Sequence, residues 1–107
     1  MEQAASPRLR QLQAMLQRDP DDTFLLYGIA LEYKKANQFA AAIERLNRVI
    51  ELDPGYCYAY HQRGLVYESM GEAASARQSY LEGIEAAKRK EDDHARAELE
   101  AALSMIE

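Results

Sequence analysis

Cys57 and His61 are residue types that could form a nucleophilic pair. They are four positions apart, so on a helix they would share one face. A nucleophile of this kind needs a third group that orients the imidazole, and the sequence offers no obvious one. A cysteine inside a helix is more often a small buried side chain. We therefore expect a structural role for Cys57 and no catalysis.

A second set of side chains, Asp92, Asp93 and His94, resembles a group of metal ligands. Capping explains the two aspartates more simply, because Asp at the start of a helix accepts a hydrogen bond from a free backbone N–H. The acidic residues within 19–22, which flank a proline, are interpreted in the same way. The sequence has no glycine-rich phosphate loop and no Cys or His spacing suitable for zinc. We expect no enzyme activity, no metal site and no cofactor.

Length and charge narrow the class of protein further. The chain has 107 residues, enough for one domain, and a formal net charge of −5. An acidic chain lacks the basic surface of a nucleic-acid binder. Its one basic run, 88–90, suits the end of a helix, where cations complement the helix dipole. We expect no nucleic-acid partner.

The same composition predicts a location. No apolar run approaches the length of a membrane span, and residues 1–16 lack the apolar core of a signal peptide. The single cysteine, Cys57, has no partner for an internal disulfide, which fits a reducing compartment. The sequence therefore predicts a cytoplasmic protein that does not enter a membrane.

The elements that position these residues are helices. No segment alternates apolar and polar residues with period two, whereas apolar residues recur every three or four positions. Each of the three prolines marks a boundary, because the residue before a proline avoids the helical region. Short breaks between the helices place neighbours antiparallel. Five of the predicted helices span about 7–18, 39–52, 56–70, 72–88 and 92–106. The remaining one lies between the first two and runs from a cap at Asp21 or Asp22 to about 36.

The chain also repeats itself with a period of 34 residues. A fixed period of this size is typical of repeat proteins, in which one helical unit stacks on the next and a long face stays free for a partner. The recurring pairs are Leu31 and Tyr33 with Leu65 and Tyr67, Ala40 and Ala42 with Ala74 and Ala76, Ile50 and Glu51 with Ile84 and Glu85, and Asp19 and Pro20 with Asp53 and Pro54.

The two helix pairs resemble tetratricopeptide repeats. The first repeat, about 23–56, matches the family's large, small and aromatic positions with Leu26, Ala30, Tyr33, Ala42, Leu46, Val49 and Pro54. The second, about 57–90, offers Tyr60, Gly64, Tyr67, Gly71, Ala76, Tyr80 and Gly83, but has Lys88 where proline is usual.

This resemblance implies an all-α, right-handed α-α superhelix, or α-solenoid, that forms a single domain over 6–107. Helix 7–18 is a half-repeat and helix 92–106 a cap. Within the repeats we expect small residues where helices approach closely, with Ala30 facing Ala42 and Gly64 facing Ala76.

The resemblance also implies a function, because the family binds peptides in a concave groove lined by the first helix of each pair. The Lys, Asn and Arg clamp with which some members hold a C-terminal carboxylate is missing here: Tyr27, Leu31 and Gln62 stand at the corresponding positions. Carried over position by position, the candidate partner-binding residues are Phe24, Tyr27, Leu31, Lys34, Tyr58, His61, Gln62, Leu65 and Glu68.

Two questions remain open at this point. The first is whether the groove is accessible, because an aromatic stripe at helical spacing is often core and a terminal helix could fold over the groove and bury it. The second question is the function. The chain is either an adaptor or a structural module. As an adaptor it would be a monomer that binds an extended peptide or an amphipathic helix of another protein. In the structural case the chain self-associates by repeat stacking, for example as a weak homodimer.

Overall fold

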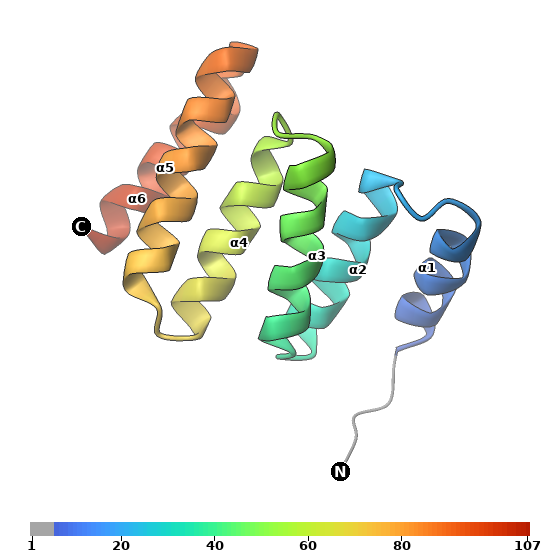
Figure 1. Cartoon of the computed structure of the whole chain (residues 1–107). Helices are drawn as coiled ribbons and strands as arrows, with labels where there is room; N and C mark the ends of the chain where they lie inside the picture. The colour runs from blue at the N-terminus through green and yellow to red at the C-terminus, as the bar shows by residue number, and fades with distance from the viewer. Residues whose placement is uncertain (1–5) are drawn as a thin grey trace.

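A computed structural model describes residues 6–107, and over that range the chain folds as six α-helices (Figure 1). The all-α architecture is therefore confirmed. The helices are α1 (Pro7–Arg18), α2 (Thr23–Lys35), α3 (Phe39–Leu52), α4 (Cys57–Ser69), α5 (Ala73–Lys90) and α6 (Asp93–Ile106).

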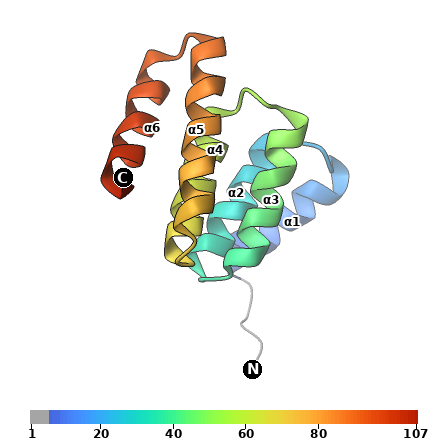
Figure 2. The same ribbon diagram turned by 60° about the vertical axis from the view of Figure 1, so that its left-hand side comes forward.

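The helices pack as sequential hairpins in two layers. Each helix contacts the next one along the chain, and α4 also contacts α2 and α6. Helices α2, α4 and α6 thus form a continuous layer, whereas α3 contacts neither α1 nor α5. In the view of Figure 1, α3 and α5 lie in front of the layer that contains α2 and α4, and Figure 2 shows the stack turned by 60°. Among the described helices, none is long and apolar enough to cross a membrane.

Side-chain caps begin three of the helices, as the sequence predicts. Ser6 Oγ accepts a hydrogen bond of 3.0 Å from the backbone N–H of Leu9 at the start of α1. Asp22 Oδ1 and Asp92 Oδ1 accept equivalent bonds, also of 3.0 Å, at the starts of α2 and α6. Each cap satisfies a donor that the first helical turn leaves free. Capping is therefore the role of Asp22 and Asp92.

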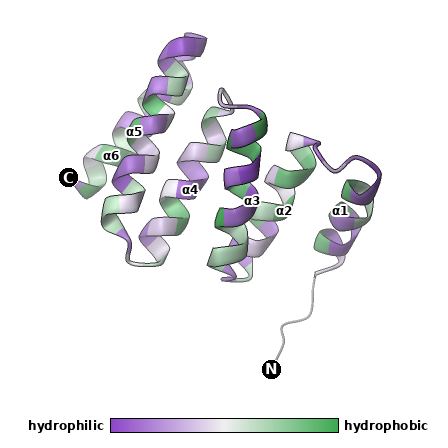
Figure 3. Cartoon of the chain, viewed as in Figure 1, coloured by the Kyte–Doolittle hydropathy of each residue, from purple (hydrophilic) through white to green (hydrophobic). Residues whose placement is uncertain are grey.

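The core forms in three clusters that follow one another along the stack. Green and purple bands alternate along α3 in Figure 3, as expected for a helix with one apolar face. The buried clusters are Leu9, Leu12, Leu25 and Ile29 between α1 and α2; Leu26, Ala30, Ala42, Leu46, Val49, Ala59 and Val66 from α2 to α4; and Cys57, Tyr60, Ala76, Tyr80, Ile84, Ala86, Ala87, Ala95 and Leu99 from α4 to α6.

The atoms nearest to Gly64 belong to Tyr80, a neighbour that the expected pairing of Gly64 with Ala76 did not include. A Cβ atom placed on Gly64 would lie 2.2 Å from Cε1 of Tyr80. The fully buried Tyr80 ring occupies the space that the absent side chain leaves. Ala76 is itself fully buried, one turn earlier on α5.

The second helix of the second repeat ends two residues later than the predicted position of about 88. Helix α5 has 18 residues and α3 has 14. Because Lys88 stands where the first repeat has a proline, α5 continues to Lys90 and ends at Glu91, which adopts the left-handed conformation (φ 54°). Helix α6 therefore begins 36 residues after α4, although α4 begins 34 residues after α2. This shift of two residues decides which side chains of α6 border the second repeat.

Candidate partner-binding face

The nine candidate residues lie on one layer of the stack, and none of them is buried. We call this set the α2–α4 face: Phe24, Tyr27, Leu31 and Lys34 of α2, and Tyr58, His61, Gln62, Leu65 and Glu68 of α4. Phe24 is 69% exposed and Tyr58 is 41% exposed, which is unusual for large rings without a partner. The stripe is therefore not core.

Polar contacts join the two helices across this face. The Lys34 ammonium donates a hydrogen bond of 2.8 Å to Gln62 Oε1. Partial burial lowers the pKa of Lys34. Beside this pair the Tyr27 ring packs on Tyr56, with centroids 5.2 Å apart. Burial, followed by the interaction with Tyr56, raises the pKa of Tyr27. The only cationic side chain among the nine is thus already bonded within the protein.

His61 lies at the centre of the α4 part of the face. Its ring meets the Tyr80 ring edge to face at 5.9 Å, and the Tyr80 hydroxyl donates a hydrogen bond to the Glu68 carboxylate. Burial lowers the pKa of His61, although Glu98 and Glu68 act in the opposite direction. At neutral pH the imidazole is therefore neutral and presents a flat, weakly polar surface.

The Cys57 thiol is not paired with the His61 imidazole. The Cys57 thiol donates instead to the backbone carbonyl of Gly55, at a distance of 3.4 Å. Burial raises the pKa of Cys57, whereas a nucleophilic cysteine needs a lowered pKa. Cys57 is a buried core residue, as the sequence predicts.

The terminal helices leave the α2–α4 face accessible. Within the described part of the chain, α1 contacts only α2, so it does not reach α4. Helix α6 packs beside α4 and adds a third helix to the same layer. The charge of its Glu98 carboxylate acts to raise the pKa of both Tyr58 and His61, and the charge of Asp92 acts to raise the pKa of Tyr58. Sequence reasoning missed this acidic border, because the packing of α6 beside α4 is a long-range contact.

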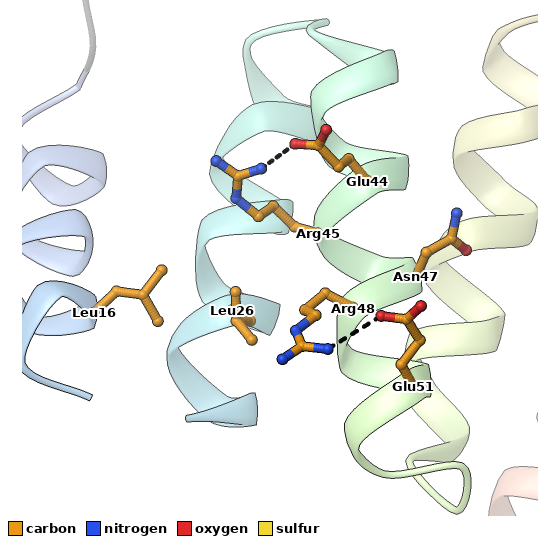
Figure 4. Close-up of a pocket in the computed structure, with 7 residues that line it drawn as sticks. All are labelled: Leu16, Leu26, Glu44, Arg45, Asn47, Arg48 and Glu51. Atoms are coloured by element: carbon orange, nitrogen blue, oxygen red, sulfur yellow. Dashed lines mark hydrogen bonds and ion pairs between the residues drawn. The ribbon is translucent and has the colours of Figure 1, made fainter. Parts of the chain in front are cut away.

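Two cavities border α3. The larger has a volume of about 490 Å³ and lies between α1, α2 and α3 (Figure 4). A second, of about 290 Å³, lies between α3, α4 and α5. The larger is lined by Leu16, Leu26, Glu44, Arg45, Asn47, Arg48 and Glu51, and the smaller by Asn47, Arg63, Tyr67, Ser75, Gln78, Ser79 and Glu82.

Charged groups around these cavities are paired with one another. Arg48 contacts Asp21 at 2.9 Å and Glu51 at 3.3 Å. Arg63, only 12% exposed, donates to Asn47 Oδ1, Ser79 Oγ and Glu82 Oε1 at 2.5–3.0 Å. Arg63 thereby ties α3, α4 and α5 together, which is a structural role.

Comparisons with known proteins agree with the helical repeat. The family model described as "TPR repeat" matches residues 30–71, and the one described as "Tetratricopeptide repeat" matches residues 58–90. A TPR repeat-containing protein of Pseudomonas aeruginosa is 29% identical over 96 residues, which cover 90% of this chain and 91% of that protein.

Solved structures show the same arrangement. A tetratricopeptide repeat domain protein of Salinibacter ruber superposes with a TM-score of 0.78 at 30% identity, over 83% of this chain and 90% of that one. The TPR2B domain of yeast Sti1, in complex with pHsp70, superposes with a TM-score of 0.85 at 21% identity, over 92% of this chain and 78% of that one. The helix pairs, the matched models and these relatives together show that the chain belongs to the tetratricopeptide repeat family.

Proposed function

We propose that the protein is a non-catalytic interaction module that holds an extended peptide or an amphipathic helix of another protein against the α2–α4 face. The observation that carries this proposal is the exposure of Phe24 and Tyr58, two large rings on neighbouring helices of one layer. Interface energy concentrates in a few anchors of this kind, since they bury much apolar area and lose little conformational freedom.

Two further observations support this function. Tetratricopeptide repeats are generally non-catalytic interaction scaffolds, and the Sti1 domain of the same fold was solved in a complex. Tyr27, Leu31 and Gln62 stand where some members carry the residues that hold a partner's C-terminal carboxylate, so the face is not suited to that kind of partner. The proposed location is a separate point. We propose the cytoplasm, because the unpaired thiol of Cys57 fits a reducing compartment.

The test compares binding with folding in one pair of variants. The double change Phe24→Ala and Tyr58→Ala removes the two exposed anchors, and changes at exposed positions usually alter stability by only about 0.5 kcal/mol each. We expect a partner captured by the parent protein from a lysate of its native host to be lost from the variant. The melting temperature should stay within a few degrees of the parent's.

The matched control is Met15→Ala with Met70→Ala. These side chains are 53% and 41% exposed, so the control also truncates two exposed apolar groups, but away from the α2–α4 face. It should retain the partner. Equal capture by the parent and both double variants would reject the α2–α4 face as the binding site. A large fall in the melting temperature of the variant with Phe24→Ala and Tyr58→Ala would assign those rings to the core.

A further inference from the structure

We propose, on the basis of the proposed function, that the α2–α4 face selects a partner segment with an apolar side chain at one end and a Lys or Arg side chain at the other. The apolar side chain packs on Phe24 of α2. The basic side chain lies over Tyr58, at the border between α4 and α6. The face therefore selects partners by charge as well as by apolar character. Because its two ends differ, it also fixes the direction in which the segment lies.

The α2 end of the face suits an apolar group. Phe24 exposes most of its ring, and Leu31 lies on the same stripe, partly exposed, two turns further along the helix. Helix α2 carries two lysines, both in its last turn: Lys34 is bonded to Gln62, and Lys35 pairs with Glu32. A side chain arriving at Phe24, in the first turn, therefore meets an apolar ring at the opposite end of the helix from both cations.

The α4–α6 border is acidic. Glu98 is 43% exposed, and its Oε1 lies 3.4 Å from Nε2 of the exposed His94 imidazole, which forms an ion pair with it only when protonated. Glu68 accepts a hydrogen bond from the Tyr80 hydroxyl, and Asp92 caps α6. These contacts do not include a Lys or Arg; the lysine charges that act nearby are that of Lys34, which acts on His61, and that of Lys90, which acts on Cys57. Burial, then the charges of Glu98 and Asp92, raise the pKa of Tyr58, as expected for a hydroxyl beside negative charge.

Helix α6 leaves room for a long side chain at this border. Counted from the first residue of each helix, Ala97 and Ala101 of α6 correspond to His61 and Leu65 of α4. Both alanines are exposed and short. A Lys or Arg side chain can therefore lie along α6, with its charge near Glu98 and its stem on the Tyr58 ring. This combines a charge-assisted contact with packing of the apolar stem against the ring.

The experiment uses a displayed library of random 12-residue peptides, selected in parallel on the full-length parent, on Glu98→Lys and on Glu85→Lys. Glu85 lies on α5, is 64% exposed and pairs with Lys88, so its reversal is a control with the same change in net charge. We expect Lys and Arg to be enriched in peptides selected on the parent and on the Glu85 variant, and not on the Glu98 variant.

Affinity measurements on one selected peptide complete the test. We expect the Glu98→Lys variant to bind it about three- to tenfold more weakly at low salt, with the difference shrinking as salt screens the charges. Equal enrichment of basic residues on all three proteins, or an affinity unaffected by Glu98→Lys, would overturn the charge selection.

If the proposed function itself is wrong, the same experiments give different results. Selected peptides that bind equally well to the variant with Phe24→Ala and Tyr58→Ala would reject the α2–α4 face as the binding site. A parent protein that enriches no peptide at all would contradict both proposals. Peptides that need Phe24 and Tyr58 but carry no basic residue would leave the proposed function intact and remove only the charge selection.

Discussion

One glycine on α4 sets how closely the two helices of the second repeat approach. The ring of Tyr80 lies where the Cβ atom of any other residue at Gly64 would be. That ring is fully buried, and its hydroxyl is held by Glu68. A planar ring fixed at both ends cannot move aside as a flexible side chain would. The close contact is therefore a requirement of the packing.

Replacing Gly64 with alanine should destabilise the protein. The added Cβ would lie 2.2 Å from the Tyr80 ring, and overpacking of this kind costs about 1–3 kcal/mol, against a gain of roughly 1 kcal/mol for alanine within a helix. Urea denaturation measures the free energy of unfolding. Gly28→Ala is the matched control, since its Cβ would lie at an ordinary 3.4 Å from Leu12, and it should be neutral or stabilising. Equal stability of the two variants would contradict the packing described here.

At the scale of elements, the prolines and the 34-residue period predict most helix boundaries within one or two residues. Pro20 and Pro54 each follow a helix and fix its end. The end of α5 was harder to predict, because neither proline nor glycine marks it and Glu91 adopts a left-handed conformation at the cap. The close approach of Tyr80 to Gly64 was also beyond the sequence, since helical spacing places Ala76 and Tyr80 on the same face of α5.

Helix α6 covers the apolar face of α5, and removing residues 92–107 should expose it. Leu99 and Ala95 of α6 are buried with Ala86 and Ala87 of α5 in one cluster. Terminal repeats need a polar outer element to shield such a surface. We expect the truncated chain to bind a hydrophobic dye and to elute as larger species in size-exclusion chromatography. A monomeric truncation that keeps its helicity per residue and binds no dye would show that α6 is dispensable.

At the scale of the whole molecule, the sequence could place the candidate face but not establish its exposure. Tyr27, Tyr58, Tyr60 and Tyr80 all occur at helical spacing, yet the last two are buried and the first two are not. What separates them is the arrangement of neighbouring helices, which depends on long-range packing. The acidic border of α6 could not be predicted for the same reason.

The two ends of the stack differ from its interior, which bears on self-association. Helix α6 presents Arg96 and Glu100 at the positions that correspond to the buried Leu26 and Ala30 of α2. These two side chains are 44% and 49% exposed and form an ion pair of 3.2 Å. A third repeat stacked on α6 would have to desolvate that pair, which is unfavourable. We therefore expect the parent protein to be monomeric.

Restoring the apolar residues of the interior repeats should remove this barrier. In the variant with Arg96→Leu and Glu100→Ala, the outer face of α6 gains the residue types that α2 uses to pack on α3, and the partly buried Leu103 lies beside them. Met15 on α1, 53% exposed, offers apolar surface at the opposite end of the stack, so copies can associate head to tail. A concentration series in analytical ultracentrifugation should show association that the parent lacks. The variant with Glu85→Ala and Lys88→Leu, which replaces an exposed ion pair on α5, should stay monomeric. If the parent already associates as strongly as the α6 variant, the polar outer face of α6 does not limit stacking.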